Sequence, residues 1–226
     1  MKKALLLVTA VLATSLLSFA QDQPRWELFG GYAYGRLDIH DAQNALTQAT
    51  NAAGLAPLNL GNHLNSSGWD LSLQENPADW FGLVFDIGGN YNKKDVNLAP
   101  DLSLPTGTTE VIRLKPSVYT FTGGPQLTYR KNSRFQPFGR VLLGLAYGRA
   151  SANELTNGVP ILQSDIHTSQ TAFDFTAGGG LDYHFEKHVA FRASADYIRT
   201  YFSSLTQNNL RVSVGLTYRW TNSPAF

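Results

Sequence analysis

The clearest feature of this chain is a segment near its end that alternates without exception between two kinds of side chain. From Leu210 to Trp220, every second residue is a large apolar or aromatic one. The residues between them are polar or small: Arg211, Ser213, Gly215, Thr217 and Arg219. Because successive side chains of a β-strand point to opposite faces, this pattern predicts a strand with one apolar and one polar face.

The same period-two pattern recurs along most of the chain and predicts an all-β fold. Seven further segments show it: 26–36, 69–74, 81–91, 119–129, 138–149, 173–183 and 189–201. Val84, Ile198 and Arg199 depart from the pattern by occupying the opposite face. The segments at 26–36 and 138–149 show it more weakly, setting large apolar residues against Gly and Ala.

The connections between these segments alternate in length. Tight turns at 75–79, 131–134 and 184–188 follow long connections near 37–66, 92–116 and 151–169. Short turns at one end and long loops at the other are typical of outer-membrane barrels. We therefore expect a transmembrane antiparallel up-and-down β-barrel of about eight strands. An even strand number places both termini at the short-turn, periplasmic end.

The first twenty residues have the features of a secretory signal peptide. Lys2 and Lys3 precede an apolar stretch over 4–17, and small residues lead to a predicted cleavage between Ala20 and Gln21. An N-terminal membrane anchor is the alternative, but the apolar stretch is shorter than the roughly 20 residues that span a bilayer. We expect residues 1–20 to be removed and residues 21–226 to form one barrel domain in the outer membrane.

Composition excludes several classes of protein. The chain has no cysteine, which excludes disulfide scaffolds, thiolate metal sites and a cysteine nucleophile. Removal of the signal peptide leaves 16 basic residues against 17 acidic ones, so no basic field for nucleic acid exists. After Ala20 no apolar run reaches the length of a membrane-spanning helix. That would suit a secreted soluble protein or a barrel, whose strands expose only alternate residues to lipid.

Aromatic residues on the apolar face fall into two groups. Amphipathic rings favour the two bilayer interfaces, so we predict two aromatic girdles with aliphatic residues between them. The girdle near the short turns contains Trp26, Phe81, Tyr129, Tyr183, Phe191, Tyr218 and Trp220. The girdle near the loops contains Tyr34, Trp69, Tyr91, Tyr119, Tyr147, Phe173 and Tyr201.

The polar face carries charges of both signs. It collects Glu27, Asp70, Asp86, Asp174, Asp182, Asp196, Arg140, Arg192, Arg211 and Arg219. An eight-stranded barrel is just wide enough for side chains to fill, so these groups must pair there. We interpret them as a polar plug that closes the interior. The functional alternatives are a gated ion path and a pair of catalytic carboxylates.

The last strand also resembles a known assembly signal. Ser213-x-Gly215-x-x-Tyr218-x-Trp220 is similar to the C-terminal signal of the OmpA-like and opacity-protein-like family of small outer-membrane barrels. The resemblance covers the mature chain in pattern. It implies that the outer-membrane insertion machinery recognises this strand. The chain departs from the family in the six residues that follow Trp220, where Phe226 offers another terminal aromatic residue.

Other candidates for chemistry are weaker. Asp165, His167 and Ser169 are the ingredients of a catalytic triad, but they alternate along one extended segment, whereas working triads draw partners from different elements. His184 and His188, with Glu186 between them, suit a polar turn better than a metal site. A short helix is predicted over 41–53, with Asp41 as its cap and Gly54 as its end.

The function that these patterns favour is a non-enzymatic structural or surface-interaction role, with membrane lipid as the surroundings and no cofactor. A narrow porin-like channel is one alternative, and a lipid-modifying barrel enzyme is another. A secreted lipocalin-like binder would need its apolar face inside and a Gly-x-Trp signature that Pro24-Arg25-Trp26 lacks. The sequence specifies no external ligand.

Overall fold

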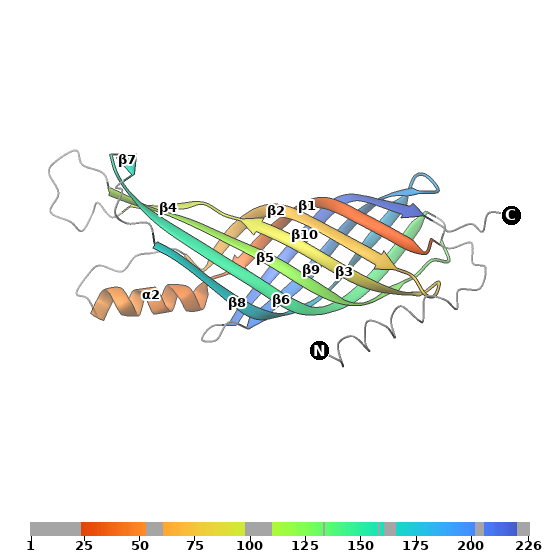
Figure 1. Cartoon of the computed structure of the whole chain (residues 1–226), viewed down its shortest axis with the longest axis horizontal. Helices are drawn as coiled ribbons and strands as arrows, with labels where there is room; N and C mark the ends of the chain where they lie inside the picture. Colours follow the sequence, from red (N-terminus) through yellow and green to blue (C-terminus); the bar gives the residue numbers. More distant parts are fainter. Residues whose placement is uncertain are drawn as a thin grey trace, which may run out of the picture.

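The computed structural model describes residues 24–52, 61–97, 110–132, 134–157, 159–160, 166–201 and 206–220. In chain order, that part of the protein forms β1 (Trp26–Asp38), α2 (His40–Ala52), β2 (His63–Glu75), β3 (Phe81–Tyr91), β4 (Lys94–Asn97), β5 (Glu110–Thr128), β6 (Phe135–Thr156), β7 (Val159–Pro160), β8 (Ile166–His184), β9 (Val189–Tyr201) and β10 (Thr206–Trp220). β4 and β7 are short, and the other eight strands build one barrel (Figure 1).

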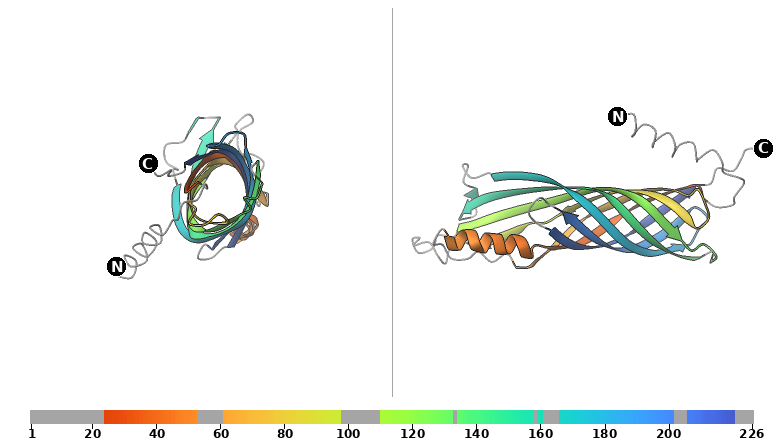
Figure 2. Two further views of the ribbon diagram at one scale, coloured as in Figure 1. Left: turned by 90° about the vertical axis from the view of Figure 1, so that its right-hand side faces the viewer. Right: turned by 90° about the horizontal axis from the view of Figure 1, so that it is seen from below.

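The eight long strands form a closed antiparallel barrel. Each pairs with its neighbours along the chain, β5 pairs with β6, and β10 pairs with β1 to complete the ring (Figures 1 and 2). The strands are staggered around the ring. If one starts at Arg36 of β1 and moves from each residue to its partner on the next strand, one returns to β1 at Trp26, ten residues from the start. Such a stagger accompanies the strand tilt that closure requires. The prediction of an antiparallel barrel of about eight strands is confirmed.

The strands are longer than the alternation predicted. β2 begins at His63, β5 at Glu110 and β8 at Ile166, and β6 continues to Thr156. Ordered strand therefore occupies parts of the connections placed near 37–66, 92–116 and 151–169. Beyond the aromatic residues of the loop end both faces of a strand meet polar surroundings, so the period-two signal that marks a strand is lost there.

The first long connection contains the predicted helix, with a different cap. α2 begins at His40, whose backbone N–H donates to Asp38 Oδ1 at 3.0 Å. Asp41 lies in the first turn instead, where its charge suits the helix N-terminus. Gly54 lies outside the described residues. Within the described ranges, no helix combines the length and apolar character needed to cross a bilayer.

The barrel interior and its outer wall differ in chemistry. Polar and charged side chains are buried inside, whereas the exposed large residues are mostly aliphatic or aromatic. Val84 and Ile198 are buried and Arg199 is exposed, as their departures from the alternation predicted. Phe29, Phe138 and Leu142 are also buried. The interior is therefore a mixed core with a polar majority.

Candidate functional site

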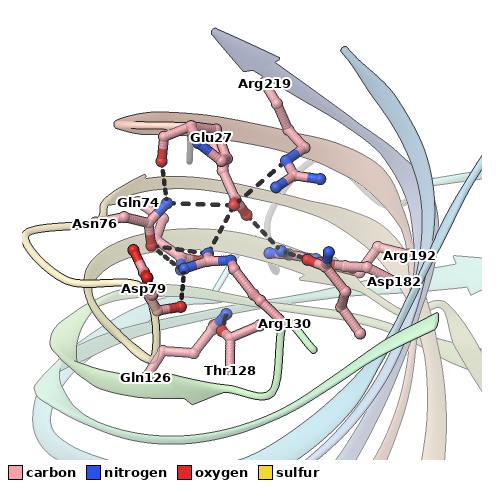
Figure 3. A network of polar contacts seen from close by, with 12 residues as sticks. Glu27, Gln74, Asn76, Asp79, Gln126, Thr128, Arg130, Asp182, Arg192 and Arg219 are labelled. Atoms are coloured by element: carbon pink, nitrogen blue, oxygen red, sulfur yellow. Dashed lines mark hydrogen bonds and ion pairs between the residues drawn. The ribbon is translucent and has the colours of Figure 1, made fainter. Parts of the chain in front are cut away.

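Near the short turns, the interior of the barrel (the lumen) holds a group of ion pairs that we call the short-turn cluster: Glu27, Arg130, Asp182, Arg192 and Arg219 (Figure 3). Arg192 donates to Asp182 through two nitrogens, at 2.6 and 2.7 Å, and to Glu27 at 3.2 Å. Arg130 donates to the same Glu27 at 2.8 Å. Arg219 lies 3.6 Å from Glu27. Glu27 thus joins three arginines from β5's end, β9 and β10.

Further from the short turns lies the mid-lumen cluster: Asp70, Asp86, Arg140, Asp196 and Arg211. Arg140 binds Asp196 in bidentate fashion, at 3.0 and 2.6 Å, and contacts Asp86 at 3.3 Å. Arg211 donates to Asp86 and to Asp196 at 3.1 Å each. Because β3 and β9 lie on opposite sides of the ring, these contacts tie facing walls together.

Asp70 and Asp174 are held more loosely. Asp70 lies 3.6 Å from Arg211 and 3.9 Å from Arg140, and neither of its oxygens accepts a hydrogen bond within the described structure. Asp174 accepts a hydrogen bond from Thr176 at 2.8 Å. All ten charged residues assigned to the polar face from the sequence are buried, and nine of them make ion pairs; Asp174 is the exception.

Burial shows how firmly these side chains are enclosed. Arg192 and Arg211 are 1% and 2% exposed. The guanidinium of Arg192 also lies 4.6 Å from the ring centroid of Phe138 and 5.6 Å from that of Phe29. Aromatic faces attract cations, so the two rings add a second means of holding this charge.

Sequence reasoning missed two members of the short-turn end. Arg130 follows the end of β5, and Asn76 follows the end of β2. Arg130 donates to Asn76 at 3.0 Å, and Asn76 donates to Glu27 at 3.2 Å (Figure 3). The alternation of the strand could have identified Arg130. The side chains of Gln126 and Thr128 point inward, and Arg130 is the next residue in this every-second-residue series, just past the strand end.

The two clusters differ in charge balance. The short-turn cluster sets three arginines against two carboxylates, whereas the mid-lumen cluster sets two against three. Asp174 adds another acid on the inner wall. Opposite charges are therefore separated along the axis of the barrel, with the positive excess at the short-turn end.

The aromatic residues of the outer wall lie side by side around the ring at the loop end. Trp69 donates to the Tyr91 hydroxyl at 3.2 Å, and the Tyr91 and Tyr119 ring centroids are 5.8 Å apart. Tyr119 pairs with Tyr147 across β5 and β6, and Phe173 pairs with Tyr201 across β8 and β9. Tyr34 is exposed on β1 of the same wall.

At the other end the register brings together the second group of rings. Trp26 pairs with Trp220, and Tyr183 pairs with Phe191. Tyr218 lies 5.7 Å from Trp220 between ring centroids, Phe81 is the first residue of β3, and Tyr129 follows the last residue of β5. Trp80 and Phe185, in the short turns, are further exposed aromatic residues at this end that the sequence analysis did not assign.

The remaining candidates are dispersed. His184 is buried at the lumen end, whereas His188 stacks on Tyr218 with ring centroids 6.3 Å apart, so the two histidines do not face each other. His167 and Ser169 lie along β8, and Asp165 lies outside the described residues. Ala20, Gln21 and Phe226 also lie outside them. Ser213 is buried in the lumen, while Tyr218 is exposed on the outer wall of β10.

A closed eight-stranded antiparallel barrel with an apolar, aromatic-lined wall and a charged interior is the architecture of a bacterial outer-membrane barrel. The family model described as "Outer membrane protein beta-barrel domain" matches residues 5–219, and the chain belongs to this family. The protein is therefore an outer-membrane barrel whose outer wall lies in lipid. No individually curated protein shows significant sequence similarity to the chain.

Comparison with solved structures finds matches over most of the chain. Ail, the attachment invasion locus protein of Yersinia pestis, solved in complex with the heparin analogue sucrose octasulfate, is 17% identical with a TM-score of 0.52. That match covers 87% of this chain and 99% of Ail. Neisserial surface protein A is 11% identical with a TM-score of 0.49, covering 88% of this chain and 100% of that one. At 17% identity the similarity to Ail concerns the fold alone.

Proposed function

We propose that this protein is a non-enzymatic outer-membrane barrel with a closed lumen, which anchors its loop end at the cell surface for a structural or interaction role. The observation that carries the proposal is the pair of buried clusters that join facing walls. Guanidinium groups that bind carboxylates in bidentate fashion have fixed orientations, so they block the lumen as a firm plug.

The proposed orientation places the short turns in the periplasm and the loop end outside. It is supported by the lengths of the connections, since short periplasmic turns and long external loops are the rule for such barrels. β5, β6 and β8 carry the loop end beyond the aromatic residues of the outer wall, with β4 and β7 attached at their edges (Figure 1). This projecting part is the natural surface for external contacts.

A narrow channel is the second candidate, because much of the lumen wall is polar without being paired. Buried hydroxyl groups of Ser72, Thr120, Thr122, Ser213 and Thr217 have no hydrogen-bond partner within the described structure. Such groups suit bound water, and connected water would conduct ions. Catalysis is less favoured, since no histidine ring in the described part is hydrogen-bonded to a serine or a carboxylate.

Planar-bilayer recording distinguishes the closed barrel from the channel. We expect the wild-type protein to show little or no steady conductance, and Arg140→Ala to open intermittent currents by removing its three ion pairs across the lumen. The matched control is Arg199→Ala, which removes an exposed arginine from the outer wall. Steady wild-type conductance, with an ion selectivity that Arg140→Ala shifts, would establish a channel instead.

A further inference from the structure

A hollow on the outer wall lies apart from the lumen and has no role in the function proposed above. It has a volume of about 500 Å³ and is found at the loop end of β1, β2 and β10. Its lining residues are Tyr34, Arg36, His63, Asn65, Leu210 and Val212. None of them points into the barrel, because all are exposed or half-exposed on the outer face.

The strand register shows how this lining is built. Arg36 of β1 pairs with Asn65 on one side and with Leu210 on the other. Tyr34, one outward position nearer the membrane centre, pairs with Val212. Polar groups thus gather at the β1–β2 side, and aliphatic groups lie on β10. The aliphatic part continues along β10 through Val214 and Leu216, which are exposed on the wall that faces lipid.

The polar groups of the hollow have unused hydrogen-bonding capacity. Among the described residues, the side chains of Arg36 and His63 form no hydrogen bond or ion pair, and the Tyr34 hydroxyl forms no hydrogen bond. Asp38, the next outward residue of β1, accepts a hydrogen bond from the backbone of His40. A free arginine beside an interfacial tyrosine lies at the depth where lipid headgroups carry their charge.

We propose that this hollow binds a phosphate-bearing lipid of the outer leaflet. Arg36 donates to the phosphate in bidentate fashion, and His63 and Tyr34 add single donors. An acyl chain of the same lipid lies along Leu210 and Val212. The assignment to the outer leaflet rests on the proposed orientation. The assignment to a phosphate-bearing lipid rests on the positive charge of Arg36 beside the aliphatic surface of β10.

The test uses the mature chain folded in zwitterionic detergent micelles. Native mass spectrometry measures the affinity for diphosphorylated lipid A and for its dephosphorylated form. We expect the phosphorylated lipid to bind the wild type at least about tenfold more tightly, the size of one charge-assisted hydrogen bond. Arg36→Gln should remove most of this preference, Arg36→Lys should retain part of it, and His63→Gln should weaken it less.

Arg199→Gln is the matched control, because it removes one exposed arginine from the outer wall at the loop end but outside the hollow. It should leave the affinity within about twofold of the wild type. The proposal is overturned if wild type binds both lipids equally, if Arg36→Gln retains the preference, or if Arg199→Gln reduces it equally. Lipid binding in micelles depends on neither conductance nor orientation. These outcomes therefore do not bear on the closed lumen, which planar-bilayer recording tests separately.

Discussion

At the scale of single residues, burial separates the ion pairs of this protein into two kinds. Arg113 and Asp95 form a well-aligned pair beyond the lipid band, with contacts of 2.8 and 2.9 Å, but both side chains are solvent-exposed. The hydrogen bond from Arg113 lowers the pKa of the Asp95 carboxyl, so this pair is formed at neutral pH and is lost as the pH falls through that lowered pKa. Arg211, in contrast, contacts three carboxylates inside the barrel, where all four side chains are buried.

This contrast predicts unequal effects of removing an arginine. Arg192→Ala leaves the buried Asp182 without its arginine, and Arg211→Ala leaves Arg140 alone against three buried carboxylates, so each should lower the free energy of unfolding by roughly 3–5 kcal/mol. Arg113→Ala should have a much smaller effect, because water screens the exposed Asp95. Urea unfolding of the protein in lipid vesicles measures all three. Equal, small losses for every variant would mean that the lumen is wide and hydrated.

At the scale of elements, the seam between β1 and β10 closes the ring and is tightly packed. Eleven residues of each strand are paired, from Trp26 with Trp220 to Arg36 with Leu210. A Cβ added at Gly215 would lie 2.2 Å from the Gly30 carbonyl oxygen and 2.5 Å from the Gly31 Cα. One at Gly30 would meet only Leu71 Cδ1, at 3.8 Å. Within the seam, an added side chain is thus far more crowded at position 215 than at position 30.

Two alanine substitutions in this seam should therefore differ. Gly215→Ala forces the two backbones apart and should destabilise the barrel by about 1–3 kcal/mol, the usual cost of overpacking. Gly30→Ala, in the neighbouring strand, should cost little. Urea midpoints in vesicles, with the gel mobility of unheated samples as a check of folding, test the pair. A larger effect at Gly30 would show that the seam is packed differently.

The last strand should also control assembly, and we expect the insertion machinery to recognise it. Deleting residues 210–226 removes most of β10 and leaves β1 and β9 with unpaired edges, which lipid does not tolerate. The deletion should abolish insertion, whereas combined Tyr218→Ala and Trp220→Ala should slow it. Insertion rates into membranes measure both. If only a Phe226 substitution slows insertion, the recognised residues are those of the tail.

At the scale of the whole molecule, the two ends of the barrel are built differently. Three tight turns close one end, where the described chain also begins and ends, while α2 and the extended strands form the other (Figure 2). The positive excess of the lumen lies at the first end and the negative excess nearer the middle. Orientation in the membrane therefore decides which charge faces the periplasm.

Cysteine labelling tests the proposed orientation without background, because the chain has no cysteine of its own. His40→Cys, at the start of α2, should react with a membrane-impermeant maleimide on intact cells. Asn132→Cys, in an exposed short turn, should react only after the outer membrane is disrupted. The reverse labelling pattern would place the short turns outside.

The barrel could be predicted from the sequence alone. Successive side chains of a strand point to opposite faces, so a strand between lipid and a polar lumen must alternate apolar and polar residues. Alternation did not predict the strand residues 63–66 and 110–118, where the outer face is mostly polar: His63, Asn65, Arg113, Lys115 and Ser117. Tertiary structure alone decided which charges meet, because Glu27 and Arg130 are 103 positions apart and become neighbours only through closure and stagger. The alternation along a strand shows that a side chain points inward, but the register between strands decides how far along the barrel axis it lies. The register also brings Arg36, His63 and Leu210 together at one hollow, although they lie on three different strands.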